Sequence, residues 1–244
     1  MVIFMIDKEI VNTFKEVSLN FIGNSNSLHS LGLNSKKLED AASKQIVDIL
    51  RTNKEIVYTS SRNESNSLVI FGFLDKYKYR NKEVIVFKEV DNSIKDALEY
   101  MKKFGINVVY VDDISILKDR MNKNVVLVCC SNIDVEKIDN ILKDYNAKLL
   151  IDITDSFDIN FDFNMGDFIV FDSSSVNSIR GIAALLKNKN IVLEPLYHGG
   201  KSTTIYRSGT PFLPFIVSFS KGVKLMYKKM NNSHYNNGDE SGKR

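Results

Sequence analysis

The stretch that decides the fold is residues 167–175, Asp-Phe-Ile-Val-Phe-Asp-Ser-Ser-Ser, where a continuous apolar run ends in a polar turn. Its core residues do not alternate with polar ones, as expected of a strand that is covered on both faces. Similar runs of strand length recur at Glu55–Thr59, Glu83–Phe87, Asn107–Val111, 124–129, Lys148–Asp152 and 182–186. With Phe168–Asp172, they predict seven strands.

Helical patterns lie between these runs. Apolar residues follow helical spacing from Ile94 to Met101 and from Ile138 to Tyr145, and Asn92 and Asp134 are plausible N-caps. Alternating strands and helices predict right-handed crossovers and a three-layer α/β/α fold with a mainly parallel seven-stranded sheet. Residues 211–229 predict one further helix that closes a domain of residues 1–230, and the polar tail 231–244 is predicted to be disordered.

Composition excludes several classes of function. The net charge of +3 is small for 244 residues, and because no basic block stands out, we expect no nucleic-acid partner. No apolar run approaches the length of a membrane span, and residues 1–6 indicate a short strand, not a signal peptide. The adjacent Cys129 and Cys130 close an apolar run, which favours inert core thiols in a reducing cytoplasm over a reactive pair or a disulfide.

Three separated segments carry a resemblance to a known family. Residues 23–32 (GNSNSLHSLG), 59–66 (TSSRNESN) and 194–200 with 207–210 (EPLYHGG and RSGT) resemble the GNPSSxHxxG, TSGATESN, EPxxHGG and RSGT motifs of cysteine desulfurases. They occur in the right order with matching strands between them, and the resemblance covers roughly residues 7–229. It implies the large domain of a fold-type I pyridoxal-phosphate (PLP) transferase, in the class V aminotransferase superfamily.

The resemblance also implies a role for individual positions. Ser175 stands where the family has the lysine that binds PLP, and a hydroxyl cannot form that Schiff base because the bond needs an amine. Asp152 aligns with the aspartate that pairs with the protonated ring nitrogen. Arg62 and Asn63 lie in the helix start that cradles the phosphate. Thr210 aligns with a threonine that reaches across the dimer to the partner's phosphate, but we favour the alternative that its loop is structural packing at a dimer interface. We therefore expect Asp152, Asn63, Arg62 and Thr210 to form a vestigial cofactor site, with no catalytic residue.

Other positions depart from the family further. Asp91 falls near the histidine that stacks on the ring, Asp155 stands at a glutamine, and Asp172 replaces a serine that donates to the phosphate, which a carboxylate would repel. The chain lacks the pocket-lining loop after Cys130. The resemblance implies a truncated chain that ends at about the end of the large domain, so that the family's catalytic cysteine loop and most of its small domain are expected to have no counterpart in it.

These aspartates leave two interpretations open. They could bind a hard cation, since carboxylates suit magnesium or calcium, or they could be solvated or paired with Arg62, Arg180 or Lys201, which we favour. The chain has three histidines, His29, His198 and His234. We expect each of them to be a hydrogen-bonded residue and not a catalyst or a zinc ligand.

The sequence thus predicts a degenerate cysteine desulfurase-like protein without covalent PLP or metal. Its role would be structural or regulatory, as a homodimer or as a heterodimer with a true desulfurase, or through a sulfur-acceptor protein. One alternative is an active PLP enzyme that uses a different lysine, such as Lys201, or a partner subunit. Another is a decaying gene product, against which the well-patterned core argues.

Overall fold

The computed structural model describes residues 6–131, 133–199, 204–210 and 212–236. Its elements are the strands β1 (Glu55–Thr59), β2 (Glu83–Phe87), β3 (Asn107–Val111), β4 (Val125–Ser131), β5 (Lys148–Asp152), β6 (Phe168–Asp172) and β7 (Ala183–Lys187), and the helices α1 (Lys8–Asn20), α2 (Ser30–Ile49), α3 (Arg62–Leu74), α4 (Asn92–Met101), α5 (Ile114–Arg120), α6 (Val135–Leu142) and α7 (Leu213–Asn236). Short 3₁₀ turns η1 (Asp75–Tyr77), η2 (Lys102–Phe104) and η3 (Thr154–Ser156) complete them.

The predicted mainly parallel sheet of seven strands is confirmed, in the order β1-β7-β6-β5-β4-β2-β3. Only β7 runs against its neighbours, because it follows β6 through a turn and not through a crossover helix. Strands β1, β5 and β6 therefore point the same way, and their carboxyl ends share one edge of the sheet.

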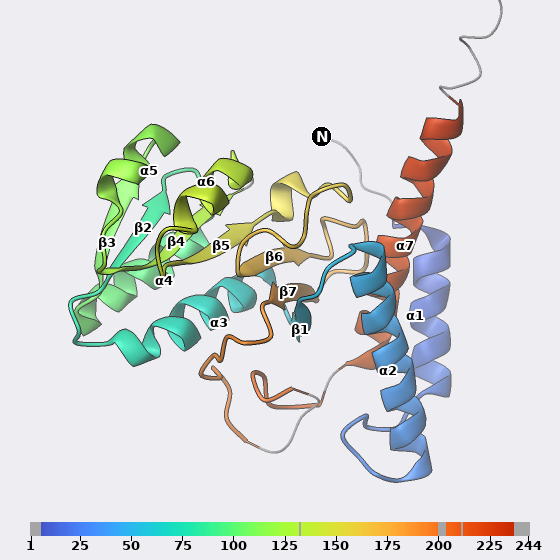
Figure 1. Ribbon diagram of the computed structural model, residues 1–244. Coiled ribbons are helices and arrows are strands. Elements are labelled where there is room, and N and C mark those ends of the chain that lie inside the picture. The colour runs from blue at the N-terminus through green and yellow to red at the C-terminus, as the bar shows by residue number, and fades with distance from the viewer. Residues whose placement is uncertain (1–5, 132, 200–203, 211, 237–244) are drawn as a thin grey trace, which may run out of the picture.

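Helices cover both faces of the sheet (Figure 1). Phe168 and Phe171 of β6 point to opposite faces because side chains alternate along a strand. Phe168 contacts Phe73 of α3, whereas Phe171 stacks on Phe219 of α7, with ring centroids 5.5 Å apart. Both faces of β6 are thus buried, which explains why its apolar run does not alternate.

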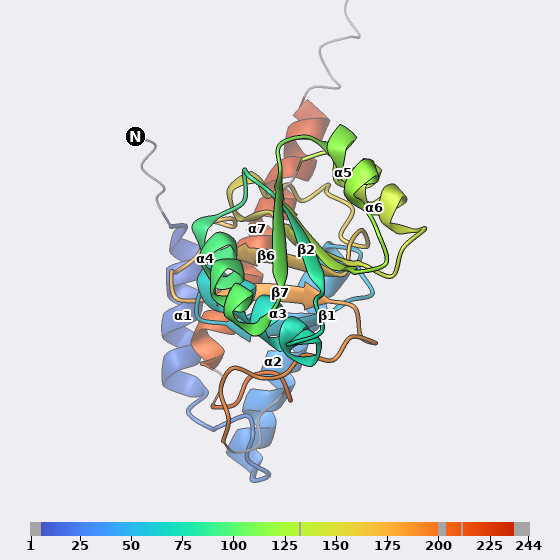
Figure 2. The same cartoon turned by 90° about the vertical axis from the view of Figure 1, so that its left-hand side faces the viewer.

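Helices α1, α2 and α7 pack together beside the β1–β7 end of the sheet (Figure 2). Phe14 of α1 contacts Phe215, and the Ser220 hydroxyl donates to the Ala42 carbonyl of α2. The helix predicted near the end of the chain is confirmed as α7, and its Phe219 and Val223 are fully buried. None of the described helices is both long and apolar enough to cross a membrane.

Several predicted boundaries were wrong. The α4 N-cap is Asp91, which accepts a hydrogen bond from the Ser93 amide, and not Asn92. Asp134 is the N-cap residue of α6, as predicted, although its backbone is left-handed (φ 44°) and its carboxylate pairs with Lys137 without a capping hydrogen bond. Residues 231–236, predicted to be disordered, continue α7, because extending a helix is far easier than starting one. Residues 1–5 and 237–244 lie outside the described residues, and Ile6 belongs to no strand.

Candidate functional site

Polar side chains gather at the carboxyl edge of the sheet. Thr59 of β1 and Asp172 of β6 flank Ala183 of β7 there, and Asp152 ends β5 on the same side. Open α/β sheets bind their ligands at this edge, since the loops that leave parallel strands converge on it.

Arg62 lies at the centre of these polar groups. It is the first residue of α3, directly after the N-cap Ser61, whose hydroxyl accepts a hydrogen bond from the Glu64 amide. Its Nε donates to Asp152 Oδ2 at 2.6 Å and its Nη1 donates to Asp155 Oδ2 at 2.8 Å. Asp91 Oδ2 lies 3.3 Å from the same Nη1. One guanidinium therefore pairs with three of the four predicted carboxylates.

The three carboxylates differ in burial. The Asp152 side chain is 0% exposed, Asp91 is 30% exposed and Asp155 is 81% exposed, around an Arg62 side chain that is 14% exposed. Burial alone would lower the pKa of Arg62, but hydrogen bonds and charge from Asp152, Asp155 and Asp91 raise it. The guanidinium is thus a permanent cation in a site that opens to solvent beside Asp155.

Asp152 is held from several sides. Besides Arg62, the Asn66 amide donates to Oδ2 at 2.8 Å and the Thr154 backbone N–H donates to Oδ1 at 3.0 Å. Two further polar atoms of the same residues, Asn66 Oδ1 and Thr154 Oγ1, are buried without a hydrogen-bond partner. Buried polar groups usually have partners, so these two atoms are exceptions.

Ser175 lies in the turn after β6, on the other side of this network. Its hydroxyl donates to the Thr154 carbonyl at 2.9 Å and accepts the Asp172 amide at 3.3 Å. Asp172 in turn accepts hydrogen bonds from the backbone and hydroxyl of Ser174. Both side chains are therefore used to shape the turn, and Asp172 lies outside the Arg62 cluster.

The other two predicted cofactor residues lie away from Arg62's partners. Asn63 is exposed on the first turn of α3. The Thr210 hydroxyl accepts a hydrogen bond from Asn24 at 3.0 Å, which joins the first motif to the last. Thr210 also lines a cavity of about 210 Å³ with Ser60, Arg207 and residues of α7.

Sequence reasoning missed the role of Glu64 and Asn66. The Glu64 carboxylate accepts from Arg207 Nε at 2.6 Å and from the amide and hydroxyl of Ser60. Burial would raise the pKa of Glu64, but these hydrogen bonds lower it. Asn66, four residues after Arg62, reaches the same Asp152. The available signal was this spacing, which places 62 and 66 on one face of a helix.

The other side chains that the sequence singled out are the two cysteines and the histidines. Cys129 and Cys130 are fully buried, and burial raises the pKa of both thiols, as predicted for inert core residues. His29 caps α2 through a hydrogen bond from the Gly32 amide, and His198 is an exposed residue. Within the described residues no group of histidine, cysteine or carboxylate side chains has a metal-binding arrangement. Lys201 and the side chain of His234 lie outside them.

The fold and the site together place the chain among α/β proteins with a polar site at the carboxyl edge of the sheet. Comparison with known proteins shows to which family it belongs. The model of the aminotransferase class-V family matches residues 5–241, so the chain belongs to that family. Cysteine desulfurase IscS 1 of Archaeoglobus fulgidus is 23% identical over 256 residues, which cover 98% of this chain and 65% of that protein. The mitosomal cysteine desulfurase of Trachipleistophora hominis is 26% identical over 249 residues, or 92% of this chain and 56% of that protein.

Solved structures share the fold. A NifS-like protein superposes with a TM-score of 0.85 at 19% identity, covering 93% of this chain and 68% of that one. DndA from Streptomyces lividans gives a TM-score of 0.82 at 18% identity, over 93% of this chain and 71% of that one. The chain spans between about half and two thirds of the length of the curated relatives.

The family is PLP-dependent, but the residues at this edge do not fit a covalently bound PLP. The Ser175 hydroxyl is already hydrogen-bonded to the Thr154 carbonyl, and a hydroxyl cannot form the Schiff base that an amine forms. Asp152 already pairs with a cation of the chain itself, Arg62. Neither side chain is therefore free to hold the cofactor in the way that a covalent PLP enzyme requires.

Proposed function

We propose that this protein is a non-catalytic, cysteine desulfurase-like member of the aminotransferase class-V family, with a structural or regulatory role. The proposal rests on the side chain of Ser175 in the turn after β6 and on its hydrogen bond. The Ser175 hydroxyl bonds the Thr154 carbonyl, so the turn presents no amine to an aldehyde cofactor.

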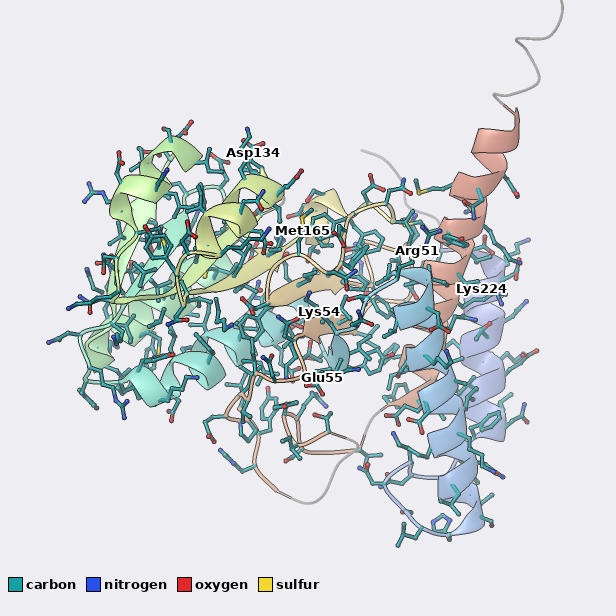
Figure 3. All side chains as sticks on the ribbon, in the orientation of Figure 1. Arg51, Lys54, Glu55, Asp134, Met165 and Lys224 are labelled. Carbon is teal, nitrogen blue, oxygen red and sulfur yellow. The ribbon has the colours of Figure 1, made fainter. Side chains whose placement is uncertain are left out.

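The buried lysines of the described chain offer no substitute. Lys54 and Lys187 lie at the opposite edge of the sheet from Asp152, at the start of β1 and the end of β7 (Figure 3 labels Lys54 beside Glu55). Lys187 is fully buried and bonds Glu55 and the Ile191 carbonyl. Lys54 donates to the Asn164 carbonyl at 2.9 Å. Neither amine can reach the site without unfolding its end of the sheet.

A role through a protein partner is supported by the surface near the first motif. Large apolar side chains are exposed from the end of α1 to the start of α2: Leu19, Ile22, Leu28, Leu31 and Leu33. Contiguous exposed apolar patches on a folded protein mark interaction surfaces. We propose that this segment contributes to a homodimer, or to a heterodimer with a cysteine desulfurase or a contact with a sulfur-acceptor protein, in the cytoplasm.

The cofactor half of the proposal is tested by adding PLP to the purified protein. We expect no new visible absorbance and no adduct after borohydride reduction, because the described site has no free amine. Peptide mapping of reduced samples also tests the alternative, an active enzyme that uses another lysine. An adduct at one specific lysine, together with sulfide release from cysteine, would establish that alternative.

The partner half needs a separate experiment. Tagged protein is captured from its native host beside the variant Leu28→Glu/Leu31→Glu, with Tyr79→Glu as a control at another exposed site. We expect a cysteine desulfurase, a sulfur-acceptor protein or a second copy of the chain with the wild type and the control, and a loss in the double variant. Recovery of none of these, with a monomeric mass by light scattering, argues against the proposed role.

A further inference from the structure

Two loops at the β3 end of the sheet form one basic surface, which consists of residues 75–83 and 99–104. This end of the molecule is turned toward the viewer in Figure 2. The Tyr79 amide donates to the Phe104 carbonyl at 2.7 Å and so joins the two loops. The basic surface lies at the amino ends of β2 and β3, on the opposite edge of the sheet from the Arg62 cluster.

Positive charge is concentrated on this basic surface. Its two segments contain six basic and three acidic residues, so their formal net charge equals the +3 of the whole chain. Asp75 pairs with Lys78, and Glu99 pairs with Lys102. The other four basic side chains of the surface form no ion pair within the described part of the chain: Lys76, Arg80, Lys82 and Lys103. These four cations are available to an anionic partner.

The expectation of no nucleic-acid partner was based on the small charge of the whole chain. A charge of +3 over 244 residues is weak, but the same charge on two adjoining loops is a local electrostatic footprint. The strand β2 and the helix α4 separate the two segments in the sequence, and only the fold brings them together.

Aromatic rings lie among these charges. Four rings form a continuous series, with neighbouring centroids between 5.5 and 6.2 Å apart: Phe71, Tyr100, Phe104 and Tyr79. Tyr79 is 75% exposed and Tyr100 is 48% exposed. The Tyr79 backbone is left-handed (φ 60°), which is uncommon for a residue other than glycine, and its hydrogen bond to Phe104 fixes it. The Tyr79 ring is thus held outside the core.

A cavity of about 440 Å³ lies beside this series of rings. Phe71, Tyr100 and Phe104 line it, together with Lys78 and the carboxylates of Asp75 and Glu194. An uncharged planar group suits such a lining better than an anion, because the rings offer stacking surfaces whereas the two carboxylates repel negative charge. Anionic groups of the same partner would instead lie outside the cavity, beside the unpaired cations.

These features favour one kind of partner over two others. An acidic peptide would use the cations, but its charged side chains bring no planar ring to the tyrosines. A lipid surface presents phosphates without planar groups. Single-stranded nucleic acid carries a phosphate and an uncharged planar base in every nucleotide, and its bases stack on aromatic side chains. The bases of a duplex are already stacked and paired, so a single strand fits best.

We propose that the basic surface binds single-stranded nucleic acid. Bases stack on Tyr79 and Tyr100, and phosphates pair with Arg80, Lys82 and Lys103. This inference goes beyond the proposed function and does not depend on it, because the basic surface is separate from the turn after β6.

Fluorescence anisotropy of a labelled oligothymidylate strand, titrated with the full-length protein, tests the proposal. We expect binding at low salt that weakens about 20- to 50-fold between about 50 and 200 mM salt, because about three or four phosphate contacts release counterions. Tyr79→Ala should weaken binding at least about fivefold, whereas Tyr79→Phe, which keeps the ring, should bind as the wild type does. If Tyr79→Ala does not fold by circular dichroism, Tyr100→Leu takes its place.

A second pair of variants tests the charges. Arg80→Glu/Lys103→Glu should weaken binding about tenfold or more, because it removes phosphate contacts and adds repulsion. Lys44→Glu/Lys137→Glu makes the same change in net charge on exposed lysines of α2 and α6. This control should bind within about twofold of the wild type, since charges more than about 10 Å away are screened at about 0.1 M salt.

Polyglutamate and vesicles of an anionic lipid distinguish a nucleic acid from the two other classes of partner. At equal concentration of charge, neither should compete as strongly as unlabelled oligothymidylate. The inference is overturned if the wild type does not bind, if the ring-free variant binds as tightly as Tyr79→Phe, or if both charge variants lose binding equally. Equal competition by polyglutamate or by vesicles would also overturn it and would assign the surface to an acidic protein or to a membrane.

Discussion

At the scale of single residues, burial decides how much each contact of Arg62 contributes. Asp152 and Asp155 both lie within hydrogen-bonding distance of the guanidinium, but only Asp152 is removed from water. An exposed pair is screened by solvent, whereas a buried charge depends on its partner. Similar distances therefore do not imply equal contributions to stability.

This difference predicts the effects of two alanine variants. Asp152→Ala should lower the free energy of unfolding by about 3–5 kcal/mol, because it leaves a partly buried guanidinium without its main partner. Asp155→Ala should change it by less than about 1 kcal/mol. Urea unfolding of the two variants beside the wild type measures both values. Similar losses in the two variants would contradict this account of the cluster.

A second prediction concerns the missing amine. Ser175→Lys alone should not form a Schiff base with pyridoxal, because Arg62 still occupies Asp152, whereas Ser175→Lys/Arg62→Ala should. Pyridoxal is preferred to its phosphate, since Asp172 would repel the phosphate group. Borohydride reduction and peptide mapping locate the adduct, and Ser174→Lys on the exposed neighbouring serine is the matched control. Equal labelling of position 175 with and without Arg62 would show that the arginine does not close the site.

At the scale of helices and strands, the sequence predicted what depends on local pattern. All seven strands were predicted within about two residues, because continuous apolar runs between polar turns indicate buried parallel strands.

The Arg62 cluster could be proposed from the sequence only as one of two alternatives. Its members come from segments up to 93 residues apart, and periodicity within a segment says nothing about such contacts. The same limit hid the tertiary role of Glu64 and Asn66.

The loop between α2 and β1 yields a prediction about pH. Burial lowers the pKa of Lys54 to about 8, partly offset by Asp167, Asp139 and Asp162. In the unfolded chain a lysine keeps a pKa of about 10.4. Between these values the unfolded state binds more protons, so this lysine should make the folded state more stable as the pH rises from 8 towards 10.4.

The measurement is urea unfolding of the wild type and Lys54→Met across that range. The wild type should gain on the order of 1–2 kcal/mol relative to the variant, after allowance for solvent screening. Lys44→Met, on an exposed side chain of α2, should follow the wild type. A constant difference between wild type and Lys54→Met would show that Lys54 titrates normally in the folded protein.

At the scale of the whole molecule, one continuous core joins the sheet to the helices beside it. Tyr58 of β1 is hydrogen-bonded to Ser43 of α2, and α7 contacts both α1 and α2 while its Phe219 stacks on β6. Contacts that span the layers in this way bind the elements into a single cooperative unit. A chain that was losing its fold through drift would carry polar residues in these buried strands. The buried residues of β2, β4 and β7 are instead all apolar except Lys187.

We therefore expect the protein to unfold in one transition. The chain has no tryptophan, so tyrosine fluorescence reports on packing at positions such as Tyr58, while far-ultraviolet circular dichroism reports on helices and strands. The two curves should coincide in urea, with the same midpoint and slope. Ser43→Ala, which removes the partner of the Tyr58 hydroxyl, should move both curves together by about 1 kcal/mol. Separate midpoints, or a gradual loss of signal without a transition, would favour a decaying gene product over a maintained protein.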